Sequence, residues 1–302
     1  MEQVVRGAVI DPSVLIGARF EARYINVTRA SRALANLAGA KRSTRRGRGV
    51  EFDEVRQYAA GDDVRAIDWR VTARSGDPHT KLFHEERERP VLVAVDLRRP
   101  MFFGSQNCFK SVLAAYTASL LLWSALDRGE RVGGMVFAGD HANDIRPARS
   151  RKAVLSMIGE LGRHTNASPE AEMPFSEQLR QIQRIARPGS SLFLLSDFSD
   201  GLDAEALDTL RRLARHLQIT ALAISDPLEQ ELPAAGRYVV ADTKGRAALN
   251  TSDPAIRQRY REDYESHYAA LTRAYQGLRI PIIQLSTGSA PLLSLQRYFP
   301  TR

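Results

Sequence analysis

The clearest pattern along the chain is an uninterrupted apolar run at residues 91–95, which ends in Asp96. Because the run does not alternate between apolar and polar side chains, it predicts a strand buried on both faces, as in parallel sheets covered by helices. Open α/β sheets bind their ligands at the carboxyl ends of such strands. Asp96 is therefore the first candidate for a functional residue.

From residue 90 onward, strand-like and helix-like patterns alternate regularly. Further strands are predicted at residues 131–137, 144–149, 191–196, 219–224 and 280–285. Helices are predicted at residues 110–128, 152–161, 176–186, 253–278 and 292–298, and another begins after Asp203, a suitable N-cap. This alternation predicts an α/β fold, a Rossmann-type sheet with helices on both faces.

The predicted helix at residues 253–278 carries aromatic and aliphatic residues at three- and four-residue spacing. They are Ile256, Tyr260, Tyr264, Tyr268, Leu271, Tyr275 and Leu278. Such a stripe is typical of a helix face packed against a core. We therefore interpret it as core packing rather than as a ligand-binding surface.

The first 89 residues are less apolar. Residues 1–48 contain one helical pattern around Leu34 and Leu37, followed by a basic loop with Lys41, Arg42, Arg45, Arg46 and Arg48. Residues 49–89 are densely charged and show two short strand patterns, at 52–58 and 81–89. We therefore expect an N-terminal helix and basic loop (1–48), a smaller charged appendage that packs on the main domain (49–89), and the α/β domain itself (90–302).

The chain has 302 residues, a formal net charge of +8 and a sequence pI near 9.9, which raises the question of a polyanionic partner. Much of the excess lies in the basic loop, and no nucleic-acid motif accompanies it. We interpret the loop as solvated surface, with a polyanion site as the alternative, and expect no nucleic-acid partner. A single cysteine, Cys108, and the lack of a signal region or a long apolar run predict a soluble cytoplasmic protein without membrane spans.

Residues 51–88 resemble the signature of the domain of unknown function 58 family. The matching positions are Glu51, Phe52, Glu54, Arg56, Tyr58, Gly61, Asp62, Arg65, Ile67, Asp68, Trp69, Ala73, Arg74, Lys81, Glu85, Glu86, Arg87 and Glu88. In that family the signature leads into a von Willebrand factor A-like domain, which the order of strands and helices after residue 90 matches. The resemblance implies a protein–protein adaptor that works with a MoxR-type AAA+ ATPase on an unidentified client.

The resemblance also implies where a metal ion would bind. Von Willebrand factor A domains hold Mg²⁺ through an Asp-x-Ser-x-Ser loop, a threonine and a later aspartate, which align here with Asp96, Thr165 and Asp197. The two serine positions hold Arg98 and Pro100, and neither side chain has an oxygen that could bind the ion. We therefore expect a degenerate metal site and no required cofactor, with bound Mg²⁺ as the alternative.

Three arrangements are open for the arginines at this site. Arg98 or Arg99 can bridge Asp96 and Asp197 in place of the ion, which relieves the repulsion between two carboxylates. Both arginines can instead point into solvent at the rim of the sheet. A surviving metal site is the third arrangement. In either of the first two, Arg98 and Arg99 would belong to a surface that a partner protein contacts.

The charged segment of the family signature is a second candidate interaction surface. Its candidate residues are Asp62, Arg65, Asp68, Trp69, Arg74 and Glu86. For Trp69 we favour another role, as an apolar anchor that packs the appendage.

The strongest enzymatic alternative is a metal-dependent hydrolase or nuclease. Its acids would be Asp62, Asp63, Asp68, Glu85, Glu86 and Glu88, with Lys81 nearby. Arginines interleave with these acids, which is typical of a salt-bridged surface or a recognition patch. The sequence also lacks a Gly-rich phosphate loop and a Gly-x-Ser-x-Gly elbow. We therefore predict a non-catalytic interaction module, with an Mg²⁺-dependent ligand-binding protein of the von Willebrand type as a further alternative.

Overall fold

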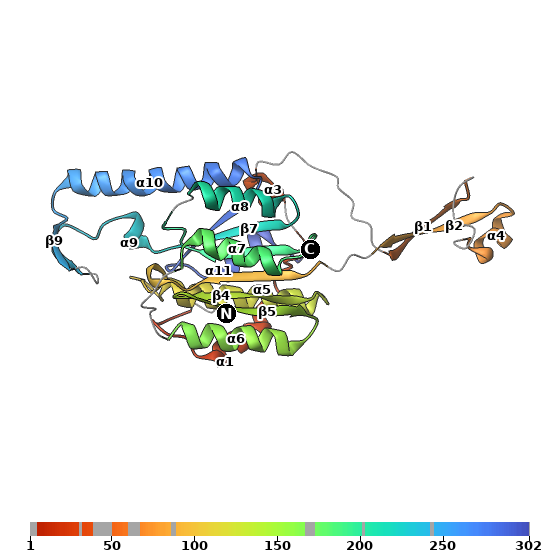
Figure 1. The fold of residues 1–302 in the computed structure, drawn as a ribbon, viewed down its shortest axis with the longest axis horizontal. Coiled ribbons are helices and arrows are strands. Elements are labelled where there is room, and N and C mark those ends of the chain that lie inside the picture. The colour runs from red at the N-terminus through yellow and green to blue at the C-terminus, as the bar shows by residue number, and fades with distance from the viewer. Residues whose placement is uncertain are drawn as a thin grey trace. The chain divides into compact units, whose positions relative to one another are not determined.

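The computed structural model describes residues 5–29, 32–38, 50–59, 67–85, 89–166, 173–200, 203–241 and 245–301 (Figure 1). The chain divides into two compact units. The larger unit comprises Met1–Lys41 and Arg89–Arg302, and the smaller one comprises Arg42–Glu88.

A six-stranded sheet forms the centre of the larger unit, in the order β10-β7-β6-β3-β4-β5. Its strands are β3 (Val91–Asp96), β4 (Val132–Ala138), β5 (His141–Ala148), β6 (Ser191–Ser196), β7 (Gln218–Ser225) and β10 (Ile282–Ser286). All neighbouring pairs are parallel except β4 and β5, which are antiparallel. The predicted α/β fold with a parallel-rich sheet is confirmed.

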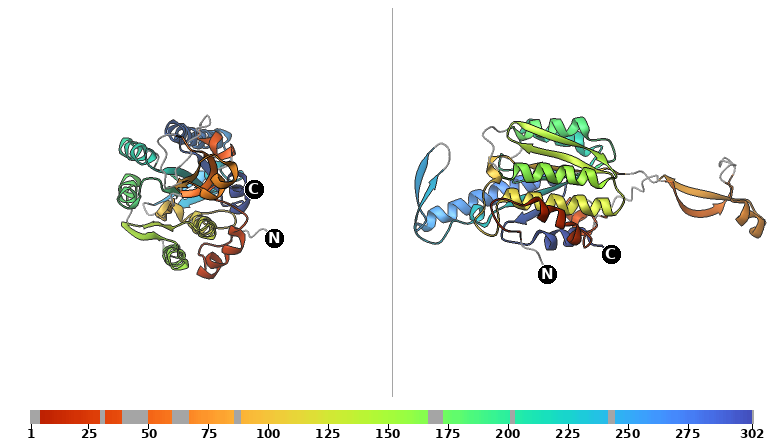
Figure 2. Two further views of the ribbon diagram at one scale, coloured as in Figure 1. Left: turned by 90° about the vertical axis from the view of Figure 1, so that its right-hand side faces the viewer. Right: turned by 90° about the horizontal axis from the view of Figure 1, so that it is seen from below.

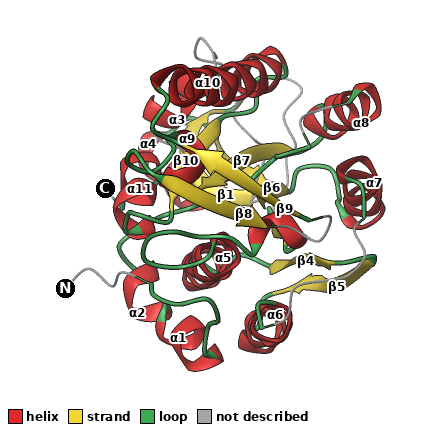
Figure 3. Cartoon of the chain, turned by 90° about the vertical axis from the view of Figure 1, so that its left-hand side faces the viewer, coloured by secondary structure: helices red, strands yellow, loops and turns green. Residues whose placement is uncertain are grey.

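Helices cover both faces of this sheet (Figure 3). They are α5 (Lys110–Asp127), α6 (Arg151–His164), α7 (Phe175–Ile185), α8 (Ala204–Ala214), α10 (Pro254–Gly277) and α11 (Pro291–Tyr298). Side chains of α5, α6 and α11 share one hydrophobic core with Val91, Val93 and Val95, whereas those of α7, α8 and α10 share the other core with Leu92 and Ala94. Strand β3 is apolar throughout because its alternate side chains enter two different cores.

The N-terminal residues belong to the larger unit. Their helices are α1 (Pro12–Gly17), α2 (Arg19–Ala22) and α3 (Arg32–Leu37). Leu15 and Ile25 are fully buried, and the indole of Trp123 on α5 donates a hydrogen bond to the Leu15 carbonyl at 3.2 Å. Residues 5–29 and 32–38 therefore complete the core over α5. This differs from the expected division, in which residues 1–48 formed a part of their own.

The smaller unit contains an antiparallel pair, β1 (Val50–Gln57) and β2 (His79–Glu85), and the helix α4 (Trp69–Ser75). The strand predicted at 52–58 is confirmed as β1, and β2 confirms the first part of the strand predicted at 81–89, of which residues 86–88 lie outside the described residues. The carboxylate of Asp68 caps α4 by accepting hydrogen bonds from the backbone N–H groups of Arg70 and Val71, at 3.0 and 3.2 Å. Helix α4 ends at Gly76, whose φ of 83° is a left-handed conformation that glycine adopts without strain.

Two elements between β7 and α10 were not predicted. They are the short helix α9 (Pro227–Gln230) and the hairpin of β8 (Arg237–Ala241) and β9 (Arg246–Asn250). The hairpin lies near the N-terminal end of α10, away from the sheet (Figure 2). Among the residues that the structure describes, no helix combines the length and the apolar character needed to cross a membrane.

Candidate functional site

The candidate site lies where β3 and β6 end side by side. The two strands are parallel neighbours, with Val95 opposite Leu195, so Asp96 at the end of β3 and Asp197 just after β6 reach the same edge of the sheet. Strand order reverses here, because β4 follows β3 on one side and β7 follows β6 on the other. Ligands of open α/β sheets bind at such switch points.

Arg98 forms a buried ion pair with Asp96. Its Nη2 lies 2.8 Å from Asp96 Oδ2, and its Nε lies 3.0 and 3.1 Å from the two carboxylate oxygens. The backbone N–H of Arg98 also donates to Asp96 Oδ1 at 3.0 Å. Both residues are 2% exposed, so the contact is a two-pronged, fully desolvated arginine–carboxylate pair.

Further polar groups complete this pair. Ser196 Oγ donates to Asp96 Oδ2 at 2.7 Å, and Gln178 Nε2 lies 3.5 Å from Oδ1. The other guanidinium nitrogen, Nη1, pairs with Asp200. Burial alone would lower the pKa of Arg98, but the hydrogen bonds and charges of Asp96 and Asp200 outweigh it and raise that pKa. Arg98 is therefore a permanent positive charge within the protein.

A second buried cation, Lys110, neutralises Asp197. Lys110 is the first residue of α5 and its side chain is 1% exposed. Its ammonium lies 2.7 Å from Asp197 Oδ2 and also pairs with Glu229. Burial works to lower the pKa of Lys110, yet the charges of these two carboxylates raise it. Asp197 and Asp96 thus each have their own cation.

The loop that holds Asp197 is tightly packed. Phe198 has a φ of 52°, a left-handed conformation that is unfavourable for a bulky residue by about 1–2 kcal/mol. Its N–H donates to Ser196 Oγ at 3.0 Å, and its buried ring packs edge-on against Phe175 and Tyr275. Ser196 therefore links this loop directly to Asp96.

These contacts change the predicted arrangement of the arginines. Arg98 is buried and does not point into solvent, whereas Arg99 is exposed on the short 3-10 helix Arg99–Met101. Arg98 does bridge two carboxylates, but its second partner is Asp200 instead of the expected Asp197. The sequence reasoning also missed Lys110. The available signal was a lysine at the start of an otherwise apolar, buried helix.

Thr165 does not join the two aspartates. It caps the end of α6, and its buried hydroxyl donates to the Leu161 carbonyl at 2.9 Å. Within the described part of the chain, no group of three or more His, Cys, Asp or Glu residues is placed to hold a metal ion. The residues present do not fit Mg²⁺, because Asp96 and Asp197 already pair with buried cations that would repel it.

The candidate residues of the smaller unit are only partly described. Trp69 is 69% exposed at the start of α4, so its ring is not part of a core within the smaller unit, and its interpretation as an anchor that packs the appendage stays a prediction. Asp68 caps the same helix, and Arg74 is exposed in its last turn. The remaining candidates of this surface and of the hydrolase alternative lie outside the residues whose side chains are described: Asp62, Asp63, Arg65, Lys81, Glu85, Glu86 and Glu88.

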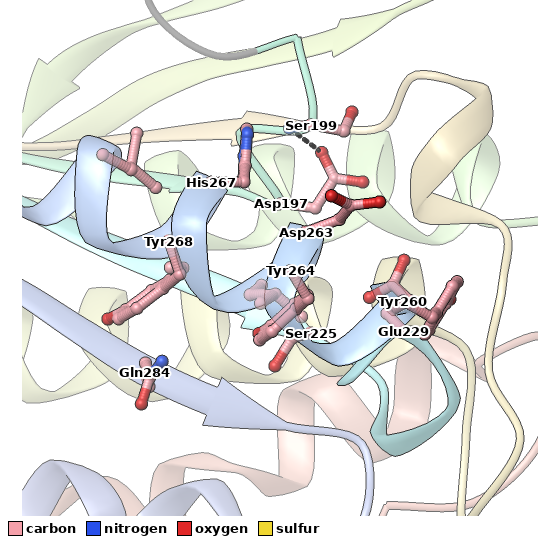
Figure 4. A pocket seen from close by; sticks show the side chains of 13 residues that line it. Asp197, Ser199, Ser225, Glu229, Tyr260, Asp263, Tyr264, His267, Tyr268 and Gln284 are labelled. Carbon is pink, nitrogen blue, oxygen red and sulfur yellow. Dashed lines mark hydrogen bonds between the residues drawn. The ribbon is translucent and has the colours of Figure 1, made fainter. Parts of the chain in front are cut away.

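A cavity of about 360 Å³ lies beside Asp197, between α10 and the ends of the strands (Figure 4). Its lining includes Asp197, Ser225, Glu229, Tyr260, Asp263, Tyr264, His267, Tyr268 and Gln284. The aromatic stripe of α10 therefore has two roles. Leu271 and Tyr275 are buried in the core as expected, but the three tyrosines nearer the N-terminal end of the helix line the cavity, which corrects the interpretation as core packing alone.

The order of the strands, with the site at the switch point, defines a von Willebrand factor A-like domain in which arginine and lysine occupy the centre of the site. Residues 54–270 match the family described as "Protein of unknown function DUF58". Because this match covers most of the chain, the protein belongs to the DUF58 family.

Two relatives of the chain are described as uncharacterized proteins. The uncharacterized proteins Rv1480 of Mycobacterium tuberculosis and Mb1516 of Mycobacterium bovis are each 27% identical to it over 257 residues, covering 85% of this chain and 80% of theirs. Similar solved structures include BatB from Bacteroides thetaiotaomicron, 16% identical with a TM-score of 0.41, covering 63% of this chain and 98% of that one. The SpRpn10 VWA domain is 10% identical with a TM-score of 0.39, covering 69% and 94%.

Proposed function

We infer that the protein is a non-catalytic adaptor that binds partner proteins at the carboxyl edge of its sheet without a metal ion. The observation that carries this inference is the pair of buried cations, Arg98 on Asp96 and Lys110 on Asp197. A metal-dependent domain leaves an open coordination position for a partner's carboxylate. In this protein, the side chains of Arg98 and Lys110 supply the positive charge instead of an ion. Their charge does not depend on the concentration of divalent ions.

The buried pairs also favour a permanent structure at this edge over a switch. Removing one partner of a buried ion pair costs about 3–5 kcal/mol, because the other charge remains unpaired. Exchange of either cation for an ion would carry that cost. The site is therefore suited to present one fixed surface rather than to load and release a metal.

The resemblance of the chain to its family supports a partner class, a MoxR-type AAA+ ATPase that supplies energy for assembling or activating a client complex. Von Willebrand factor A-like domains commonly mediate protein interactions, and neither the family nor the relatives carry an assigned enzymatic activity. The adaptor would recruit the client while the ATPase performs the chemistry.

Two measurements test this function. Purified protein and the MoxR-type ATPase of the same organism, both free of nucleotide, should co-elute in gel filtration equally well in EDTA and in Mg²⁺. Calorimetric titration with MgCl₂ or MnCl₂ should give no saturable heat. Failure to co-elute would contradict the partner. Saturable metal binding that is lost in Asp96→Ala and kept in Asp140→Ala, an exposed aspartate outside the site, would favour the Mg²⁺-dependent alternative.

A further inference from the structure

The cavity beside Asp197 is lined by acidic side chains, which favour a positively charged ligand. Its acidic residues are Asp197 and Glu229, which share Lys110, and Asp263 on α10. Among the residues that the structure describes, Asp263 forms no ion pair. Three carboxylates against one buried ammonium leave a formal charge of 1 − 3 = −2 around the cavity. The cavity therefore attracts a cation.

The aromatic lining supports the same class of ligand. The rings of Tyr264 and Tyr268 are nearly parallel, with centroids 6.5 Å apart and an interplanar angle of 7°, and both line the cavity together with Tyr260. The hydroxyl of Tyr260 donates to the Leu228 carbonyl at 3.0 Å, which fixes that ring. Tyrosine faces bind guanidinium and ammonium groups, and arginine stacks on them especially well.

The size of the cavity suits a side chain. Its volume of about 360 Å³ lies at the small end of the range of about 300–1,000 Å³ for ligand pockets. The cavity also adjoins Asp197, so a group bound there would lie at the edge of the sheet that we assign to partner binding (Figure 4). A partner that inserts one side chain here would gain a buried anchor at the centre of its contact.

We propose that this cavity binds an arginine side chain from the partner protein, held by the charge of Asp263 and the faces of Tyr264 and Tyr268. The assignment rests on the proposed adaptor function. It also reverses the charge preference of a metal-dependent domain, in which a cation in the site attracts a carboxylate of the partner. In this protein the cations are internal and paired, and the unpaired charge is that of Asp263.

The direct test is titration of the full chain with N-acetyl-arginine amide, followed by shifts of backbone amide signals in NMR spectra. We expect saturable shifts confined to the cavity, and none with the uncharged isostere N-acetyl-citrulline amide or with N-acetyl-glutamate amide. Equal shifts with either of these compounds would overturn the proposal. Tighter binding of spermidine would overturn the assignment to a protein side chain.

Variants provide the matched comparison. Asp263→Asn and Tyr264→Ala should each weaken binding of the arginine amide about two- to fivefold, the usual effect of one exposed ion pair or one cation–π contact. Glu265→Gln, an exposed acid on the same helix that does not line the cavity, should leave binding unchanged. Equal affinities of wild type, Asp263→Asn and Tyr264→Ala would contradict the proposal.

The complex with the ATPase separates this proposal from the proposed function. If the wild type co-elutes with the ATPase and Asp263→Asn and Tyr264→Ala reduce co-elution while Glu265→Gln does not, both stand. If all variants co-elute equally, the adaptor function stands and the cavity is not where the partner's arginine binds. If the wild type does not co-elute, the adaptor function fails, and the amide titration still decides whether the cavity binds an arginine.

Discussion

Lys110 is a single residue on which the charge balance of the site depends. Its side chain is 1% exposed and pairs with Asp197 and Glu229. Lys110→Met should lower the free energy of unfolding by about 3–5 kcal/mol, because the 5% exposed side chain of Asp197 would keep a charge without a cation. Chemical denaturation measures this loss.

A second variant distinguishes charge from packing. Lys110→Met combined with Asp197→Asn should recover part of the lost stability, because the unpaired carboxylate is then absent. Lys152→Met, the same change at an exposed position of α6, should stay within about 0.5 kcal/mol of wild type. A double variant that is less stable by the full sum of the two single losses would show that the ion pair does not couple these residues.

Tyr268 makes the stability of the protein sensitive to alkaline pH. Burial raises the pKa of Tyr268 to about 12, so its neutral form is favoured in the folded state. The corresponding stability is complete below the ordinary tyrosine pKa of about 10 and is lost as pH rises toward the folded value. Between these pH values, urea midpoints should fall more steeply for wild type than for Tyr268→Phe. Tyr24→Phe, a change at a 49% exposed tyrosine, should follow wild type.

At the scale of elements, Asp226 joins three loops next to the site. It follows β7, caps α9 and accepts hydrogen bonds from Ser105 Oγ and from Thr287 Oγ1 after β10. Asp226→Asn should destabilise the protein by about 3 kcal/mol, because an amide cannot accept all of these donors. Thermal and urea unfolding measure the change. Asp253→Asn is the control, because asparagine also caps a helix well, and an equal loss there would contradict the role given to Asp226.

The elements that the sequence predicted well are those with long, uniform patterns. Strand β3 and helix α5 are recognisable because almost every side chain in them is buried. Helix α9 is a single half-buried turn of four residues, and the described side chains of the β8–β9 hairpin are largely exposed, so no apolar period marks either element. The same distinction applies to the site. Arg98 pairs with Asp96 two positions away, which a local pattern can suggest, but Lys110 meets Asp197 and Glu229 across 87 and 119 positions, which only the folded chain determines.

Helix α10 shows why the periodicity of apolar residues alone did not predict the cavity. Its tyrosines and leucines continue one stripe along the helix, yet only Leu271 and Tyr275 are fully buried there. Nearer its N-terminal end the same stripe lines the cavity, because the sheet edge and α9 leave space opposite Tyr260 and Tyr264. A spacing of three to four residues shows that the side chains share one face of a helix. It does not show whether that face packs against a core or lines a cavity.

At the scale of the whole molecule, the two hydrophobic cores define which residues the fold requires. Both cores consist of residues from the larger unit, and none of their described members comes from 42–88. The N-terminal residues do contribute, through Leu15, Ala18, Ala22 and Ile25. The larger unit thus builds both cores from its own described residues, although residues 42–88 interrupt its chain.

The composition of the two cores predicts that residues 42–88 can be replaced by a flexible Gly/Ser linker of about 10 residues while the larger unit still folds. The shortened chain should melt cooperatively within a few degrees of wild type, as measured by circular dichroism. By contrast, Leu15→Ala in the full chain should cost about 2–5 kcal/mol, because it opens a cavity at a side chain that is 0% exposed. Loss of cooperative melting in the shortened chain would mean that the stability of the sheet depends on the smaller unit. A Leu15→Ala variant as stable as wild type would mean that it does not depend on the N-terminal helices.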